Sequence, residues 1–470
     1  MIFFLLFSSV VAGMNAYLWK RLVRDTRLTG AAFWAATALL LALTASMPLT
    51  LVIWARVNRS LSPTLNYVAF GWLGIAFYLL LLLLCWDVLR AGSWLSRRVR
   101  RRKPPSAAEA STPSQPGVAA SEGDTRRVFL ARSAATGALA AVGGITAFGV
   151  RSALWDITTP ETAVALPRLP RALDGFSIAL LTDIHIGPLL DGRFLTQLVE
   201  ETNRLRPDLI ALGGDLVDGH VHQIGPQLAP LARLRARYGV YFVTGNHEYY
   251  SGVEDWLEYM KRLGIRVLMN ERVSIGQEGP GAKAAATSFD LAGVPDFRAA
   301  QLGRVGPDLA TTVAGRDPER ELVVLAHQPL EIGASSLAGA GLQLSGHTHG
   351  GQLYPFGALT RLVQPYIAGL HRHHTEVGSR GAREAGPATA AVIKPEVGSR
   401  GARGAGPATA AVIKPEVGSR GARGAGPATA AVIHPDTITQ IYVSCGSGFW
   451  GPPMRVLAPA EISLLRLHST

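Results

Sequence analysis

Two histidines one residue apart stand in a glycine-rich turn of the C-terminal half. The turn reads Leu-Ser-Gly-His-Thr-His-Gly-Gly-Gln from Leu344 to Gln352 and carries His347 and His349. Histidine is the commonest metal ligand, and the flanking glycines let the backbone bend so that both rings can turn toward one point. Taken alone, the turn fits a metal site and a pair of solvated loop histidines equally well.

Four further blocks place acids, amides or imidazoles directly after short, β-like apolar runs. They are Asp183-Ile184-His185 after Ser177–Thr182, Gly213-Gly214-Asp215-Leu216-Val217-Asp218 after Leu209–Leu212, Gly245-Asn246-His247-Glu248 after Val240–Val243, and His327-Gln328-Pro329 after Leu322–Ala326. In open α/β sheets, sites form at the carboxyl ends of the strands. We therefore expect the five loops to meet in one cleft.

The ordered set D-x-H, G-D-x-x-D, G-N-H-E, a lone H and G-H-x-H resembles the calcineurin-like metallophosphoesterase superfamily. Any one block is common by chance, but five in this order are not. The resemblance covers roughly Leu173 to Leu467, and the G-H-T-H-G-G-Q form is similar to bacterial membrane-anchored members. It implies an α/β fold, a two-sheet αββα sandwich, here preceded by an N-terminal transmembrane helical region.

The resemblance also implies a site with two divalent metal ions. Asp183, His185 and His349 are expected to hold the first metal, Asn246, His327 and His347 the second, and Asp215 is expected to bridge them. A metal-bridging hydroxide would attack phosphorus, and His247 would be the catalytic residue that donates a proton to the leaving oxygen or stabilises its charge. The alternative for His247 is a structural histidine that caps its turn. Oxygen and imidazole ligands suit Mn, Fe or Zn, and the sequence does not choose among them.

The neighbours of these residues are expected to play supporting parts. Asp218 is predicted to orient a metal ligand through a hydrogen bond, or to cap the following turn, rather than to bind metal, and Glu248 is predicted to play a similar supporting part. His220 and His222 are expected to be solvated loop histidines, the alternative being that they approach a substrate phosphate. His371, His373 and His374 are expected to be mobile surface histidines rather than ligands.

The N-terminal part of the chain is strongly apolar. Of the 470 residues, 48% are hydrophobic, and three runs are long enough to span a bilayer core of about 30 Å: Ile2–Trp19, Ala31–Trp54 and Tyr67–Trp86. Residues 1–90 are therefore predicted to form three transmembrane helices, with the lipid bilayer as a partner. A signal peptide would supply only one such run.

The positive charge is concentrated beside these runs. Up to Arg132 there are 16 Lys and Arg against 5 Asp and Glu, and the rest of the chain has 30 against 29. This pattern is typical of the positive-inside rule rather than of a DNA-binding face, so no nucleic-acid partner is expected. The rule places the loop after the first helix and the segment after the third helix in the cytoplasm.

Residues 91–132 are predicted to be a basic cytoplasmic linker that contains a twin-arginine-like motif, Thr125–Leu130. Residues 133–150 would then be a fourth membrane segment or a signal anchor. Alternatively, the two arginines only hold the cytoplasmic end of a fourth helix. Both interpretations place the metallophosphoesterase domain, residues 151–470, outside the cytoplasm of a bacterial inner or cell membrane.

Within that domain, short strands alternate with helical patterns at Arg193–Leu205, Gln227–Arg237 and Val253–Leu263, which predicts a central sheet covered on both faces. Residues 376–435 repeat a 20-residue unit three times. We interpret them as an insertion that forms a loosely ordered loop rather than a β-solenoid. The two cysteines, Cys85 and Cys445, predict no disulfide framework.

The sequence thus predicts a membrane-anchored, metal-dependent phosphohydrolase acting on a phosphodiester or pyrophosphate, with a substrate linked to the membrane or envelope. One alternative is a non-catalytic metal-binding or sensing membrane protein, which the complete ligand set disfavours. Another is a nuclease, which the balanced charge after Arg132 disfavours.

Overall fold

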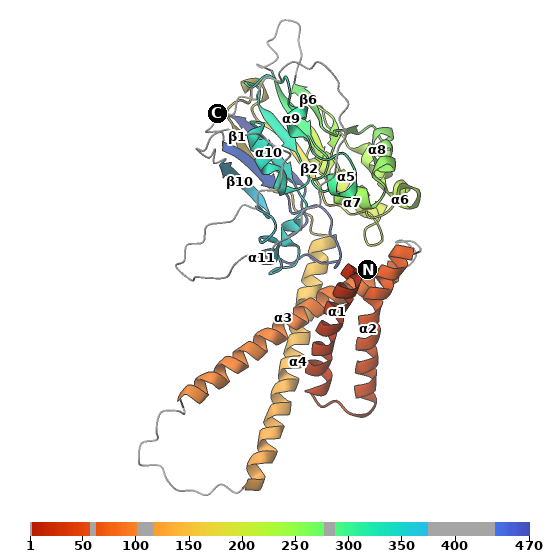
Figure 1. Ribbon diagram of the computed structural model, residues 1–470, viewed down its shortest axis with the longest axis vertical. Helices are drawn as coiled ribbons and strands as arrows, with labels where there is room; N and C mark the ends of the chain where they lie inside the picture. The colour runs from red at the N-terminus through yellow and green to blue at the C-terminus, as the bar shows by residue number, and fades with distance from the viewer. Residues whose placement is uncertain (1, 57–62, 101–115, 277–286, 375–437) are drawn as a thin grey trace, which may run out of the picture. The chain divides into compact units, whose positions relative to one another are not determined.

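The computed structural model describes residues 2–56, 63–100, 116–276, 287–374 and 438–470. Its N-terminal part is helical, and the remainder is an α/β domain (Figure 1). The repeat insertion at 376–435 and residues 101–115 of the expected linker lie outside the described residues.

Four long helices precede the α/β domain. They are α1 (Ile2–Trp19), α2 (Gly30–Arg56), α3 (Pro63–Arg100) and α4 (Pro116–Leu154), and the π-helical turn η1 (Lys20–Arg24) follows α1. Within the described residues, three stretches are long and apolar enough to cross a membrane: Gly30–Ile53, Pro63–Val99 and Thr125–Leu154. These are the candidate membrane helices of the described part of the chain.

Two boundaries differ from those expected. Helix α3 continues to Arg100, because the basic stretch after Trp86 is rich in Leu and Arg, which are good helix formers. Helix α4 begins at Pro116, inside the expected linker at 91–132. Proline is tolerated in the first turn of a helix, since its missing N–H would have no partner there.

The α/β domain contains two six-stranded sheets. The first has the order β1-β12-β2-β3-β4-β5 and the second β10-β11-β9-β8-β7-β6. The strands of the first sheet are β1 (Glu161–Leu166), β2 (Phe176–Leu181), β3 (Leu209–Leu212), β4 (Val240–Phe242), β5 (Arg266–Val267) and β12 (Ser463–Ser469). Those of the second are β6 (Glu271–Gly276), β7 (Ser288–Gly293), β8 (Leu322–Leu325), β9 (Leu342–Ser345), β10 (Gly369–His374) and β11 (Ile438–Val443).

The sheets are mixed, with a parallel centre. Strands β2 to β5 pair in parallel, as do β7, β8, β9 and β11, whereas β12, β6 and β10 add antiparallel pairings. The central strands β2, β3, β8 and β9 are buried along their whole length. This explains why they appear in the sequence as continuous apolar runs rather than as alternating patterns.

The two sheets pack face to face. Ile178 and Leu209 of the first sheet share an apolar core with Leu291, Val323 and Leu344 of the second. The opposite face of each sheet is covered by helices, which completes the expected αββα sandwich.

The covering helices are short. Over the first sheet lie α5 (Gly192–Arg204), α6 (Val221–Leu228), the 3₁₀ turn η3 (Ala229–Arg233) and α8 (Val253–Arg262). Over the second lie α9 (Leu309–Thr312) and α10 (Ile332–Leu337), while α7 (Asn246–Tyr250) and α11 (Gly357–Thr360) stand in loops. The remaining 3₁₀ turns are η2 (Arg171–Leu173), η5 (Ala300–Leu302), η6 (Pro329–Glu331) and η7 (His349–Gly351).

The prediction of a helix at Gln227–Arg237 is wrong. The α-helix α6 begins earlier, at Val221, and gives way to a 3₁₀ turn at Ala229. Pro230 enters at the start of that turn, and because proline lacks an N–H and clashes with the preceding turn, it stops the α-helix there.

Candidate metal centre

Seven of the eight residues predicted for the site are brought together at one edge of the sandwich, and the eighth, Asn246, directly precedes His247 in the chain. They stand on the loops that follow β2, β3, β4, β8 and β9, so both sheets contribute their carboxyl ends. Three groups of three side chains each have ligand atoms within 4.8 Å of one another: Asp183, His185 and His349; His185, Asp215 and His247; Asp215, His327 and His347. Asp215 belongs to two of the groups and His185 to two, so the three form one continuous cluster.

The backbone of this cluster is strained. Five of its residues have a positive φ: Asp183, His185, Asp215, His347 and His349, at 54°, 56°, 53°, 70° and 52°. A non-glycine residue in the left-handed region costs about 1 kcal/mol or more, and such strain gathers at functional sites because the surrounding structure enforces it. The turns thus aim these side chains inward at a cost in stability.

Two glycines allow the loops to approach each other. A Cβ on Gly245 would lie 2.2 Å from Oδ1 of Asp215, and a Cβ on Gly346 would lie 2.2 Å from Oδ2 of Asp183. Both contacts are closer than real Cβ atoms come. The glycines of the G-N-H-E and G-H-x-H blocks therefore leave room for the two carboxylates.

The first group centres on Asp183. Its Oδ1 lies 3.5 Å from Nε2 of His349, which in turn lies 3.1 Å from Nε2 of His185. The Asp183 carboxylate also accepts hydrogen bonds from the backbone N–H of His347 and the hydroxyl of Thr182. These bonds fix the carboxylate between the two loops.

The third group centres on Asp215. Its Oδ2 lies 3.2 Å from Nε2 of His327, while Nδ1 of His327 donates to the carbonyl of Gly213 at 2.8 Å. That bond fixes the tautomer and leaves Nε2 to face the site, the arrangement typical of metal-binding histidines. The side-chain oxygen of Asn246 is buried and, among the described residues, has no hydrogen-bond partner.

The chemistry of these donors fits bound cations. Burial lowers the pKa of His347 to about 3, with His327 adding to the effect, and burial together with His185 and Arg455 lowers the pKa of His349 well below its usual value. Both imidazoles are therefore neutral and have a free lone pair at neutral pH. Burial alone would lower the pKa of His327, but the carboxylates of Asp215 and Asp183 raise it well above its usual value. The electrostatic potential at the site is therefore negative and attracts cations. Together with the unpartnered oxygen of Asn246, this donor set suits a metal site.

Glu248 connects two of the loops without joining any of the three groups. It is fully buried, and its carboxylate accepts hydrogen bonds from the backbone N–H groups of Asp215, Leu216 and Gly245, at 3.0, 2.8 and 2.7 Å. Burial and the charge of Asp215 raise its pKa to about 7. Glu248 thus holds Asp215 in place through the backbone.

His247 is held by Asp218. Its Nδ1 makes a very short contact with Oδ1 of Asp218, and its Nε2 lies 3.9 Å from Oδ2 of Asp215. Burial alone would lower the pKa of His247, but Asp215 and Asp218 raise it to about 9. The ring is therefore protonated at neutral pH. Oδ2 of Asp218 also lies 3.4 Å from Nδ1 of His185.

Arg455 is a residue of the site that carried no recognisable motif. It is completely buried, donates to the carbonyls of Gly448 and Cys445, and has a guanidinium nitrogen 3.3 Å from Nδ1 of His349. Arg455 thereby helps to hold the His349 ring in position. By contrast, His220 and His222 stack on each other, 5.6 Å apart, and belong to none of the three groups.

Comparisons with known proteins agree with this site. The family description "calcineurin-like phosphoesterase" matches residues 176–351, the stretch that carries all five blocks. The chain is 31% identical over 392 residues to the "transmembrane protein with metallophosphoesterase domain" of Danio rerio, a match that covers 80% of this chain and 83% of that protein. The chain therefore belongs to the calcineurin-like phosphoesterase family.

A second relative is an uncharacterised metallophosphoesterase of Helicobacter pylori, 32% identical over 308 residues that make up 65% of this chain. The chain covers 63% of that protein, less than two thirds of its length. Among solved structures, the NAD nucleotidase of Haemophilus influenzae is similar at 14% identity with a TM-score of 0.27, over 37% of this chain and 38% of that one.

Proposed function

We propose that this metallophosphoesterase holds two divalent metal ions, Mn, Fe or Zn, and hydrolyses a phosphodiester or pyrophosphate. The observation that supports this best is the continuous cluster of ligand atoms in which Asp215 is shared by two groups. A shared carboxylate suits two neighbouring cations, because its charge offsets their repulsion.

The roles follow from the two outer groups. Asp183, His185 and His349 would hold one metal, and His327, His347 and the unpartnered oxygen of Asn246 the other, with Asp215 between them. When bound, such metals supply Lewis acidity toward phosphoryl oxygens and a nucleophilic water at neutral pH.

His247 supplies the proton. Its Nδ1 is occupied by Asp218, so Nε2 is the atom that faces the site, and its raised pKa keeps a proton there at neutral pH. A group of this kind can protonate the leaving oxygen of an ester. Asp218 acts through His247 and is a positioning residue.

The candidate membrane helices would anchor the enzyme in the cell membrane, with the α/β domain outside the cytoplasm. The charge bias of the helix ends supports this orientation, and the relatives named as transmembrane proteins are in keeping with the anchor. The substrate would then be a phosphodiester or pyrophosphate of the membrane or envelope. The twin-arginine-like pair Arg126-Arg127, which lies in α4, would direct export.

The test compares the full-length protein with its Asp215→Asn variant, purified in detergent and supplied with Mn²⁺. We expect the wild type to hydrolyse bis-p-nitrophenyl phosphate and to retain about two metal ions per chain. Asp215→Asn should lose at least about 100-fold in rate and should retain less metal. Asp255→Asn, an exposed acid on α8, is the matched control and should behave like the wild type. A wild type that is folded and metal-loaded yet inactive toward both this diester and a pyrophosphate would contradict the proposal.

A further inference from the structure

An apolar surface segment follows the G-H-x-H block. Between Leu353 and Val363, five large apolar side chains are exposed: Tyr354 at 61%, Phe356 at 50%, Leu359 at 57%, Leu362 at 80% and Val363 at 70%. The segment carries one charge, Arg361. Contiguous apolar surface of this kind is unusual on a domain surrounded by water and marks an interaction site.

The same segment touches helix α3. The hydroxyl of Tyr78 donates to the carbonyl of Tyr354 at 2.8 Å, and the rings of Phe77 and Phe356 pack edge to face with centroids 6.4 Å apart. Leu353 packs against the apolar cluster that α3 shares with α1 and α4. The exposed segment is therefore continuous with the surface of the candidate membrane helices.

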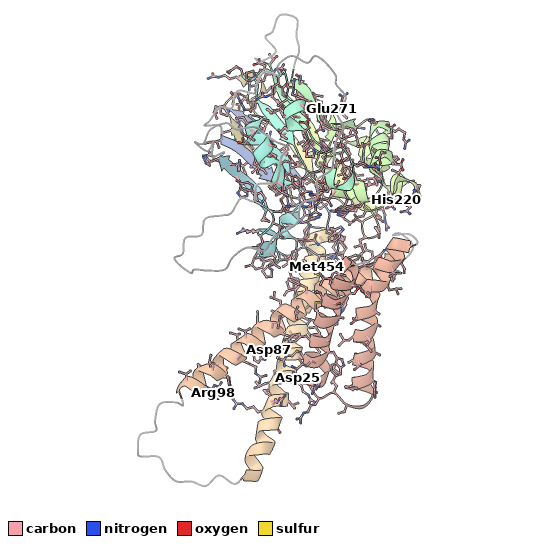
Figure 2. All side chains as sticks on the ribbon, viewed as in Figure 1. Asp25, Asp87, Arg98, His220, Glu271 and Met454 are labelled. Carbon is pink, nitrogen blue, oxygen red and sulfur yellow. The ribbon has the colours of Figure 1, made fainter. Side chains whose placement is uncertain are left out.

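A neighbouring loop makes the contact broader. Met454, labelled in Figure 2, belongs to the same cluster and fills the space left by Gly74 of α3 and Gly149 of α4. The backbone N–H of Arg455 donates to the carbonyl of Gly149 at 2.8 Å. Since Arg455 also supports His349, the loop that carries the site residue is itself seated on the helices.

The position of these contacts along α3 indicates how deep the segment lies relative to the membrane. The apolar run of α3 from Tyr67 to Trp86 has 20 residues, which is just enough to cross a bilayer core. Phe77 and Tyr78 lie near the middle of this run, roughly 16 Å along the helix from Tyr67 at 1.5 Å per residue. A segment that contacts α3 at this level lies within the apolar layer if α3 spans it.

Aromatic side chains mark the boundary of that layer. Tyr67 at the start of α3, Trp155 after the end of α4 and Trp450 in the Met454 loop are 42%, 69% and 48% exposed. Tyrosine and tryptophan gather where a membrane meets water, because their rings are apolar and their tips polar. Trp450 also packs edge to face on His247, with centroids 5.8 Å apart.

We propose that the segment 353–363 is inserted in the outer leaflet of the same bilayer that α3 and α4 cross, so that lipid covers its exposed side chains. The proposal rests on the membrane-spanning arrangement proposed above and not on the reaction. Its occupant is the lipid itself: the segment is apolar, touches membrane helices and has its single basic residue available for a phosphate headgroup.

The experiment uses the full-length protein with Cys85→Ala, so that a single new cysteine can carry an environment-sensitive fluorophore. One variant carries Leu362→Cys. Two controls carry Leu139→Cys in α4 and Val305→Cys at an apolar side chain of the α/β domain that is 76% exposed. The parent without a new cysteine corrects for labelling of Cys445. The proteins are reconstituted in vesicles of phosphatidylcholine and phosphatidylglycerol with and without lipids that carry a nitroxide quencher.

We expect a blue shift and a loss of fluorescence to the nitroxide lipids at positions 362 and 139, and neither at 305. If position 139 is quenched but position 362 behaves like 305, the segment faces water and the proposal fails, while the membrane anchor stands. If position 139 is not quenched either, the anchor fails and the insertion with it. Turnover of bis-p-nitrophenyl phosphate by each labelled protein in detergent reports separately on the folded site, so a failure of the proposed reaction is not mistaken for a failure of insertion.

Discussion

At the scale of single residues, the site depends on side chains that hold other side chains. Glu248 shows this most clearly, because its one buried carboxylate accepts hydrogen bonds from three backbone N–H groups of two loops. The bond to the N–H of Asp215 is the one that positions the proposed bridging residue.

Glu248→Gln tests this arrangement. The amide oxygen can replace only one carboxylate oxygen, so the amide NH₂ would face an N–H group of Asp215, Leu216 or Gly245. We expect a loss of about 1–3 kcal/mol in stability, seen as a lower midpoint of thermal unfolding, together with weaker metal retention. Glu258→Gln on the exposed face of α8 is the control and should leave both unchanged. An unchanged midpoint for Glu248→Gln would show that Glu248 does not hold the loops together.

Most of the residues brought together here could be predicted from the sequence, because each stands in a short block directly after a strand. Arg455 could not be predicted. It lies 106 positions from His349, and only the course of the loop after β11 brings the two together. A single arginine in a loop has no spacing that would distinguish it from a solvated one.

At the scale of elements, buried parallel strands place the five ligand-bearing blocks at one edge of the sandwich. The turns that follow these strands must be narrow. Gly346 follows β9 directly, and its missing side chain leaves room for Asp183 in the turn after β2. The closeness of the two turns is therefore a property of the element pair rather than of either residue.

Gly346→Ala should force these turns apart, because its Cβ would lie 2.2 Å from Asp183 and 2.4 Å from Thr182. We expect at least about a 10-fold loss in turnover or metal retention and a lower unfolding midpoint. Gly333→Ala is the matched control: its Cβ would meet no atom within 4 Å, and α10 should tolerate or favour alanine. Equal behaviour of the two variants would mean that the turns adjust without effect on the site.

The elements also show where reasoning from sequence ends. Amphipathic periodicity predicted α5 and α8 well, but it misplaced α6, because the position of Pro230 outweighs the apolar pattern. The length of α3 was underestimated because hydropathy marks where a helix is apolar and not where it ends. The sequence did not indicate an interaction site in the apolar segment after Gln352. Only the contacts of this segment with α3 suggest what its exposed side chains bind.

At the scale of the whole molecule, the helices and the α/β domain meet at defined ends. Tyr67, near the start of α3, donates a hydrogen bond to the carbonyl of Leu189, and Gly149, near the end of α4, accepts one from Arg455. The start of α3 and the end of α4 are therefore on the domain side. The basic stretch that ends α3 and the arginines early in α4 stand at the opposite ends of these helices.

This arrangement predicts the orientation of the protein. Because basic ends remain in the cytoplasm, a β-lactamase fused after Thr470 should protect single cells of a bacterial host against ampicillin, since this reporter protects only from outside the cytoplasm, whether it is exported folded or unfolded. The same reporter fused after Arg100, at the basic end of α3, should give no protection. If the fusion after Thr470 is expressed but gives no protection, the domain is cytoplasmic; the proposed segment would then insert in the inner leaflet, and an envelope substrate on the outer side would be excluded.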